Sequence, residues 1–358
     1  MQTRIGEKIE AGARLDRDEL LYLLGEGKEA PPALTLLGHW AHRARERKAD
    51  RSTVTFVVDR NINYTNVCVS GCRFCAFFRP PGHEEGYVLD RETLSRKIAE
   101  AIELGATQIL LQGGMNPDLD LAFHTGMLRF ITESFPGIHI HGFSPPEVAF
   151  MAERAERSID ETIAALRAAG LASIPGGGAE ILTDASRNRI SPHKCTARQW
   201  LAVMESAHSA GLRTSATMMF GHGESAAERI DHLLALRALQ DRTGGFIAFI
   251  PWSFQPCHTA LDQVKERGGH EYLRTLAVSR LALDNFDNIQ ASWVTQGASV
   301  AQTALFFGAN DFGSTMIEEN VVAAAGVSFR ISRAEIERLI ERAGFRPVQR
   351  DQAYNALV

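Results

Sequence analysis

Cysteine is scarce in this sequence, with five residues among 358. No apolar run approaches the roughly 18–20 residues that a membrane-spanning helix needs, and no signal-peptide core follows the first residues. Positive charge is not in excess either, because the formal net charge is −5, which gives no basis for binding nucleic acid or an acidic membrane. Repeats, low-complexity segments and long linkers are also missing. These absences predict a cytoplasmic globular protein with neither nucleic-acid nor membrane partners.

Two kinds of pattern divide the chain. Apolar residues at helical spacing occupy Asp16–Leu24 and Pro31–Arg45, whereas the sequence after residue 50 alternates short β-rich runs with amphipathic stretches. We therefore expect a helical N-terminal extension over 1–50 and a catalytic β/α domain with a C-terminal extension over 51–358.

The alternation of strands and helices at a spacing of roughly 30–40 residues predicts an α/β fold with a parallel sheet. A barrel with a six-strand core and a closed eight-strand barrel both fit the count, with an eighth strand expected near Phe306–Asn310. In such barrels the catalytic face is built from the carboxyl ends of the strands. The expected strands are Thr53–Tyr64, Thr107–Gln112, Ile138–Phe143, Leu171–Ile174, Arg213–Phe220, Phe246–Phe254 and Asn288–Trp293.

Three of the five cysteines stand close together after the first expected strand. Cys68, Cys72 and Cys75 form the pattern CxxxCxxC. Three thiolates can hold three irons of a [4Fe–4S] cluster and leave the fourth iron open for a ligand. A zinc site completed by His83, or simply buried cysteines, would be the alternatives. The other two cysteines are too few for a second cluster, and we expect them to be ordinary side chains.

The CxxxCxxC pattern with Phe74 before its last cysteine resembles the radical S-adenosylmethionine (SAM) superfamily. This resemblance implies a [4Fe–4S] cluster on Cys68, Cys72 and Cys75, with SAM bound to the open iron. Further segments after the expected strands resemble the SAM-binding motifs of that superfamily. The residues that the resemblance assigns to cofactor binding are Phe74, Gly113, Gly114, Glu180, Gly221 and Glu224.

Longer blocks resemble one branch of this superfamily, which contains the futalosine-pathway enzymes of menaquinone biosynthesis and the deazaflavin-cofactor synthases. Within it, the blocks are most similar to the dehypoxanthine futalosine cyclases. This implies that a 5′-deoxyadenosyl radical takes hydrogen from the ribose of dehypoxanthine futalosine, and that the sugar radical then adds to the benzoate ring. The blocks are 189–196, 249–256, 289–294, 308–316 and 318–320.

Such a cyclisation ends with the loss of a proton and an electron, so the chain should supply a proton acceptor. Glu318, Asp311 and His193 are the main candidates, and Glu319 and His222 lie on similar segments. The resemblance also implies a reducing partner such as flavodoxin or ferredoxin. Alternative functions are aminofutalosine synthase, a deazaflavin-cofactor synthase, and, from another class, a non-catalytic iron–sulfur sensor.

Overall fold

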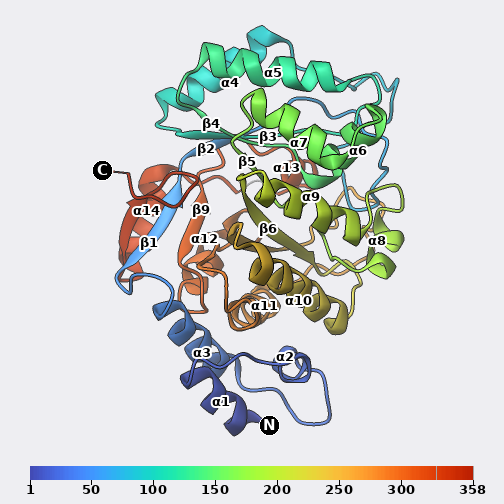
Figure 1. Cartoon of the computed structure of the whole chain (residues 1–358). Coiled ribbons are helices and arrows are strands. Elements are labelled where there is room, and N and C mark those ends of the chain that lie inside the picture. Colours follow the sequence, from blue (N-terminus) through green and yellow to red (C-terminus); the bar gives the residue numbers. More distant parts are fainter. Residues whose placement is uncertain (328, 358) are drawn as a thin grey trace.

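The computed structural model describes residues 1–327 and 329–357, and its centre is a curved array of parallel strands surrounded by helices (Figure 1). Seven strands form one sheet in the order of the chain, β2-β3-β4-β5-β6-β7-β8, and a second sheet has the order β10-β1-β9. The strands are β1 Thr53–Val57, β2 Asp59–Asn63, β3 Gln108–Gln112, β4 His139–Gly142, β5 Ser173–Ile174, β6 Arg213–Phe220, β7 Phe246–Ser253, β8 Asn288–Ile289, β9 Asp311–Ser314 and β10 Arg346–Gln349.

Backbone hydrogen bonds join the two sheets at both edges of β9. The Ala291 amide, just after β8, donates to the Asp311 carbonyl over 2.9 Å. On the other side, the Ile317 amide donates to the carbonyl of Asp59 over 3.1 Å. Because β9 thus links β8 to the β1–β2 segment, the strands complete a ring, as in the larger of the two expected barrels.

Three expected strands differ from those observed. The run expected over Asn288–Trp293 is a strand only over Asn288–Ile289, because a helix, Trp293–Ala304, begins at its last residue. The run Thr53–Tyr64 is not one strand but two, since the chain leaves the sheet of β1 at Val58 and enters the sheet of β2. The eighth strand does not lie at Phe306–Asn310 but directly after it, as β9. The expected segment forms turns instead, and Gly308 there has a φ of 105°, a left-handed conformation that strands do not use.

Helices connect successive strands, as parallel pairing requires. Polar N-caps fix many of their starts; for example, the Asp90 carboxylate accepts the Thr93 amide over 2.7 Å at the start of α4. The helices are α1 Gln2–Glu10, α2 Arg17–Leu24, α3 Leu34–Glu46, α4 Arg91–Glu103, α5 Leu121–Ser134, α6 Pro145–Arg154, α7 Ile159–Ala168, α8 Asp184–Ile190, α9 Ala197–Ser209, α10 Ala226–Thr243, α11 Gly269–Ala282, α12 Trp293–Ala304, α13 Val321–Ala324 and α14 Arg333–Arg342.

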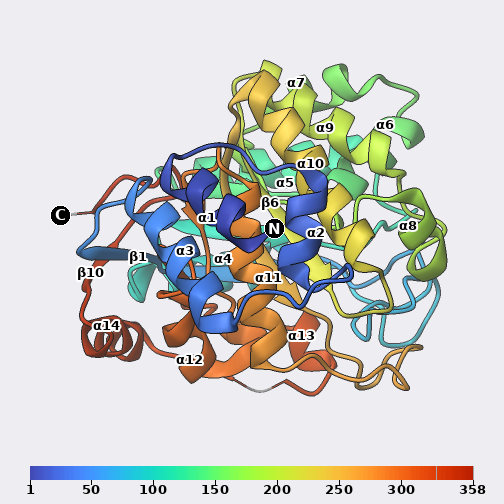
Figure 2. The same cartoon turned by 90° about the horizontal axis from the view of Figure 1, so that it is seen from below.

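The first three helices confirm the helical start of the chain and lie across one end of the molecule (Figure 2). Helix α3 packs on α11, and α2 packs on α10 and α11. Ile5, Leu20 and Leu37 are fully buried and belong to the main hydrophobic core. The division at residue 50 into extension and catalytic domain stays a prediction. No helix among the described residues combines the length and apolar character needed to cross a membrane.

The strands have two different faces. On β3, Ile109 and Leu111 are fully buried in the core between strands and helices, whereas Gln108, Leu110 and Gln112 line a cavity on the inner side. Because side chains alternate along a strand, the same element serves the core with one face and the cavity with the other.

Candidate active site

The three clustered cysteines lie on the loop that follows β2, here called the cysteine loop (residues 68–75). Ser70 Oγ lies 2.9 Å from Cys68 Sγ and 3.3 Å from Cys72 Sγ, and the Met115 amide donates to Cys68 Sγ over 3.3 Å. The Cys75 amide closes a turn onto the Cys72 carbonyl over 3.1 Å. The loop therefore brings the Cys68 and Cys72 thiols to one serine hydroxyl, with Cys75 one turn further on, and offers hydrogen-bond donors to the first two sulfur atoms, which stabilise thiolates.

Backbone hydrogen bonds fix the cysteine loop against its neighbours. The Arg73 amide donates to the Ile190 carbonyl over 2.8 Å, and the Arg73 carbonyl accepts from the Ala260 amide over 2.9 Å. The Cys68 amide donates to the carbonyl of Arg79 over 2.9 Å. With its backbone held by three distant segments, the loop keeps its thiols in place without relying on a bound group alone.

Charge around the thiols is set by burial and by Lys194. Burial raises the pKa of the Cys72 thiol, and burial together with the neighbouring Cys72 raises the pKa of Cys75 to about 11. Lys194 opposes this, because its cation lies close enough to favour the Cys72 thiolate. Lys194 Nζ is 3.1 Å from Glu180 Oε1 and 5.0 Å from the centre of the Phe74 ring. A buried cation thus connects the cysteine loop with Glu180.

Gly113 and Gly114 end β3 directly beside the cysteine loop. A Cβ on Gly114 would lie 2.1 Å from the Val67 carbonyl oxygen, so only glycine allows this approach. The Gly113 amide donates to Glu147 Oε1 over 2.9 Å, and the Tyr64 hydroxyl donates to the same oxygen over 2.8 Å. The two glycines are therefore needed to hold the loop, while their predicted contact with SAM stays a prediction.

Glu180 lies after a glycine run and has an unusual backbone. Its φ is 39°, in the left-handed region that side chains other than glycine rarely adopt. Its side chain is 5% exposed, and its Oε2, 3.6 Å from the Arg187 guanidinium, accepts no hydrogen bond. Strained backbone and an unsatisfied carboxylate oxygen are features of binding sites.

The segment from Gly221 to Glu224 is organised by the glutamate itself. The Glu224 carboxylate accepts the Gly221 amide over 2.7 Å, the His222 amide over 2.9 Å and Arg229 Nε over 2.6 Å. His222 is buried, neither ring nitrogen is hydrogen-bonded, and burial lowers its pKa. Glu224 therefore shapes the end of β6, and its predicted role with SAM stays a prediction.

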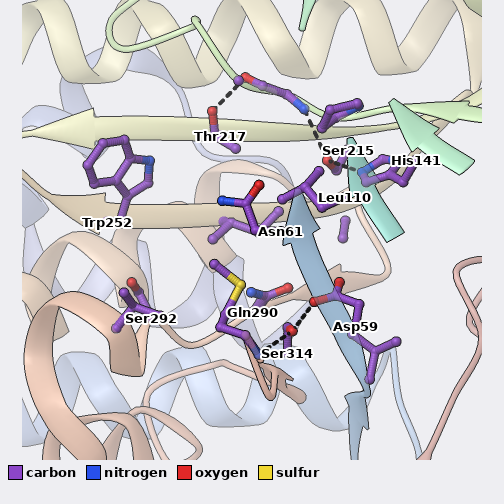
Figure 3. Close-up of a pocket in the computed structure, with 18 of the residues that line it drawn as sticks. Asp59, Asn61, Leu110, His141, Ser215, Thr217, Trp252, Gln290, Ser292 and Ser314 are labelled. Carbon is purple, nitrogen blue, oxygen red and sulfur yellow. Dashed lines mark hydrogen bonds between the residues drawn. The ribbon is translucent and has the colours of Figure 1, made fainter. Parts of the chain in front are cut away.

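A cavity of about 280 Å³ lies inside the strand ring. Glu180 and the glycines 176–178 lie along its border, and inward side chains from several strands line it (Figure 3). Polar side chains form part of its lining among apolar ones, whereas small closed barrels are normally filled by branched apolar residues. The cavity-lining polar side chains include Asp59, Asn61, Gln108, Gln112, His141, Ser215, Thr217, Gln290, Ser292, Ser314, Glu319 and Arg350.

The structure does not bring the candidate proton acceptors together. Glu318 is bound by Arg60 and Lys97, each over 2.7 Å, outside the cavity lining. Asp311 is fully buried and bound by Arg350 over 2.5 Å. His193 is exposed on a turn. Glu319 is different, because it lines the cavity and burial raises its pKa, although the start of α13 donates three amides to it.

Sequence reasoning did not single out Lys194, Asn61 or Asp59. Lys194 lies in a polar loop far from the cysteines, and no pattern connects it with them. Asp59 and Asn61 lie two positions apart in an expected strand, with Arg60 between them and apolar residues on either side of the three. Polar residues at the inward positions of a barrel strand indicate a cavity that binds a ligand. This indication can be used only when it is known which face of the strand points inward.

Comparison with known families gives two matches along this chain. Residues 62–236 match the radical SAM superfamily, and residues 243–357 match the CofH/MqnC C-terminal region. A cyclic dehypoxanthine futalosine synthase from Halalkalibacterium halodurans is 50% identical over 85% of this chain and 82% of its own length. Another from Streptomyces coelicolor is 42% identical over 98% of this chain and 88% of its own length.

Relatives with a second name are also similar. A 5-amino-6-(D-ribitylamino)uracil–L-tyrosine 4-hydroxyphenyl transferase from Methanothermobacter thermautotrophicus is 39% identical over 96% of this chain and 94% of its own length.

Among solved structures, the maturase HydG from Carboxydothermus hydrogenoformans has a TM-score of 0.77 at 18% identity, covering 98% of this chain and 80% of that one. Methylornithine synthase has a TM-score of 0.73 at 17% identity and covers 96% of both chains. These two likenesses concern the fold alone. By its sequence matches, this chain belongs to the radical SAM superfamily, in the branch that includes the cyclic dehypoxanthine futalosine synthases.

Proposed function

We propose that this enzyme cyclises dehypoxanthine futalosine in menaquinone biosynthesis. The reaction joins a ribose carbon to the benzoate ring and removes one hydrogen atom from the sugar, then a proton and an electron from the adduct. The observation that carries the proposal is the cavity inside the strand ring. One end of the cavity is bordered by Glu180, whose carboxylate is paired with Lys194, the cation beside Cys72. The 50% identity to a synthase of this name supports the choice of substrate.

The thiols of the cysteine loop fit a [4Fe–4S] cluster. They are three, they come from one loop fixed by its backbone, and Ser70 and Met115 offer donors to the sulfur atoms of Cys68 and Cys72. When bound, the cluster and SAM would supply a 5′-deoxyadenosyl radical that removes the hydrogen atom. Glu180 lines the cavity and is paired with Lys194, and the group proposed to surround SAM with it is Phe74, Gly113, Gly114, Gly221 and Glu224.

The chain's own side chains would orient the substrate and receive its proton. Trp252 and Trp293 line the cavity and can hold an aromatic ring. Enclosure within the strand ring excludes water from a reactive radical and fixes which hydrogen faces the SAM end. For the proton, we infer Glu319 as acceptor because its partly buried carboxylate lines the cavity, whereas the other lining carboxylates are held by neighbours, Asp59 by Gln108 and Glu180 by Lys194. Glu318, Asp311 and His193 remain untested predictions for the same step.

A reducing protein such as a flavodoxin or ferredoxin would deliver the electron at the outer side of the cysteine loop. Val69 is 38% exposed there, and Arg73 and Arg189 are exposed nearby. An exposed apolar side chain beside the Arg73 cation suits a small acidic protein, whereas the charge of Arg189 is paired with Glu228 over 3.0 Å.

The 4-hydroxyphenyl transferase function is the second candidate, since relatives of that name are 38–41% identical to this chain. Its substrates would be 5-amino-6-(D-ribitylamino)uracil and tyrosine. The two candidates differ in what they consume, so one experiment separates them.

The test is an anaerobic incubation of the iron- and sulfide-reconstituted protein with reductant, SAM and dehypoxanthine futalosine, followed by mass spectrometry. We expect a product lighter than the substrate by two hydrogens and one 5′-deoxyadenosine per product. Cys68→Ser should abolish both, whereas Cys257→Ser, a change of an exposed cysteine outside the loop, should leave both unchanged. Turnover of the ribityl uracil with tyrosine, and none of dehypoxanthine futalosine, would replace the cyclase with the transferase.

A further inference from the structure

A row of hydrogen-bonded side chains begins at the cavity and crosses two neighbouring strands. Ser173 Oγ, on β5, lies 2.6 Å from His141 Nδ1 and 2.6 Å from His139 Nε2, both on β4. Ser215 Oγ lies 3.5 Å from His141 Nε2, and both of these side chains line the cavity (Figure 3). We call Ser215, His141, Ser173 and His139 the His–Ser chain.

The other end of the His–Ser chain reaches solvent. His139 is the first residue of β4 and therefore lies at the end of the ring opposite to the cysteine loop, which follows the last residue of the parallel strand β2. His139 is half-buried and does not line the cavity. Its Nδ1 bonds to no described residue and is not among the enclosed polar atoms that lack a partner, so water outside the ring can reach it. Ser173 is 1% exposed, so the middle of the chain is shielded from water.

A single hydroxyl between two imidazoles fixes the direction of these hydrogen bonds. Ser173 has one hydroxyl hydrogen, so one histidine donates to its oxygen and the other accepts from it. The Gly176 amide donates to Ser215 Oγ over 3.1 Å, which leaves the hydroxyl hydrogen of Ser215 for His141 Nε2. His141 then carries its own hydrogen on Nδ1 and donates it to Ser173, which donates to His139 Nε2. Every group in the chain thus has one hydrogen to give and one position that accepts.

Both imidazoles are neutral at neutral pH. Burial lowers the pKa of His141 well below its usual value, and it lowers the pKa of His139 too. Among the charged groups near them, Arg350 lowers the pKa of His141 further, whereas Asp351 raises that of His139. Neutral imidazoles pass a proton on instead of retaining it, and the acidic neighbour draws the proton towards the outer end of the chain.

We propose that the His–Ser chain is a proton relay between the cavity and water at the amino end of the ring. A proton from the cavity enters at Ser215 or His141, each following group gains one hydrogen and gives its own to the next, and His139 Nδ1 gives one to water. This inference rests on the proposed function, in which Glu319 takes the proton from the adduct, and it adds the route by which that proton leaves. Ser173 and His139 do not line the cavity and act through His141, so they are positioning residues.

The order of the hydrogens can be measured on the unreduced protein without turnover. NMR of isotope-labelled histidine distinguishes a ring nitrogen that carries hydrogen from one that does not. We expect His141 and His139 each to carry hydrogen on Nδ1 only. Ser173→Ala should allow both tautomers in both rings, whereas Ser173→Thr, which keeps the hydroxyl, should preserve the parent order.

The matched control breaks a similar pair that does not reach the cavity. His208 Nε2 lies 2.7 Å from Thr214 Oγ1, and neither residue lines the cavity. Thr214→Val should therefore change the ring signals of His208 and leave those of His139 and His141, and product formation, as they are in the parent protein.

Turnover measures whether the reaction uses the relay. Ser173→Ala and His139→Gln should lower the steady-state kcat by roughly 10-fold, because each further turnover has to wait until the proton has left the cavity. Single-turnover product formation and the KM for SAM should stay within about 2-fold of the parent values, because neither depends on that exit. The solvent deuterium isotope effect on kcat should increase in both variants, and Ser173→Thr should have the parent kcat.

The outcomes separate the relay from the proposed function. Parent-like kcat in both variants, a mixture of tautomers in the parent protein, or equal losses in single-turnover and steady-state rates would overturn the inference while the function stands. If the parent protein does not turn over dehypoxanthine futalosine, the proposed function fails. The tautomers then decide alone, because the fixed order supports the relay and a mixture overturns it.

Discussion

On β3, successive side chains point to opposite sides of the sheet: those on the outer side pack in the hydrophobic core, and those on the inner side border the cavity. Ile109 and Leu111 are fully buried against the helices, whereas Gln108, Leu110 and Gln112 border the cavity. The outer face is filled and apolar, whereas the inner face carries both polar and apolar side chains around a cavity. The comparison teaches that the fold depends on the outer face of the ring, which leaves the inner face available for binding and chemistry.

The largest expected effect concerns the inner face. Glu319→Gln should lower kcat by about 10²- to 10⁴-fold, because a side chain that borders the cavity loses its ability to accept a proton. Burial raises the pKa of Glu319, so the parent activity should also fall as the pH drops through that raised pKa. Single-turnover product formation measures both effects. Glu318→Gln is the control, and a large loss there with none at Glu319 would assign the proton to Glu318.

Opposite faces of one strand can also be compared by stability. Ile109→Ala should cost about 2–5 kcal/mol of unfolding free energy, because it opens a space in a filled core. Leu110→Ala should cost clearly less, because its side chain already borders a cavity. Urea unfolding of both variants gives the two values. Equal losses would show that the inner face carries as much of the fold as the outer one.

His232 is a buried histidine on helix α10, on the outer side of the strands. Its titration allows the contribution of the outer core to stability to be measured as a function of pH. Burial lowers the pKa of His232 to about 3, and its Nδ1 accepts the Leu182 amide over 3.0 Å. The pKa of this histidine is about 6.5 in the unfolded state, so below pH 6.5 the unfolded state binds a proton that the folded state does not. The contribution of His232 to the unfolding free energy is therefore complete above pH 6.5 and decreases as the pH falls towards 3. The loss by pH 4 should be on the order of 2–3 kcal/mol. Urea unfolding of His232→Gln between pH 7 and pH 4 should show an unfolding free energy that decreases less with falling pH than that of the parent protein. An unchanged decrease would show that other groups cause the pH dependence.

The smallest expected effect is at the border between cavity and cysteine loop. Glu180→Gln should raise the KM for SAM by about 10-fold, because it removes the negative charge that faces Lys194 at the border of the cavity. Asp184→Asn, on the nearby helix α8 and away from the cavity lining, is the control and should leave that KM unchanged. An unaltered KM in Glu180→Gln would remove Glu180 from the SAM site.

Much of this organisation could be predicted from the sequence, because periodicity and caps are local. The alternation of strands and helices, the helical start of the chain and the cysteine loop all followed from nearby residues. The break at Val58 could not be predicted, because the β-rich run 53–64 has no interruption and the partners of its halves come from elsewhere in the chain. Lys194 was missed for the same reason, since only folding brings it to Cys72.

That break has a consequence for the order of folding. β1 has partners on both sides, β9 and β10, and both come from the last fifty residues of this sequence, so no neighbour in the chain can pair with it early. Closing such a long loop carries a high entropic cost, which makes these contacts late ones. During synthesis β2 to β8 can assemble in sequence, while β1 waits, with unpaired edges that a chaperone or another chain can bind. We therefore expect refolding to show a slow final phase in which the ring closes and the cavity is completed.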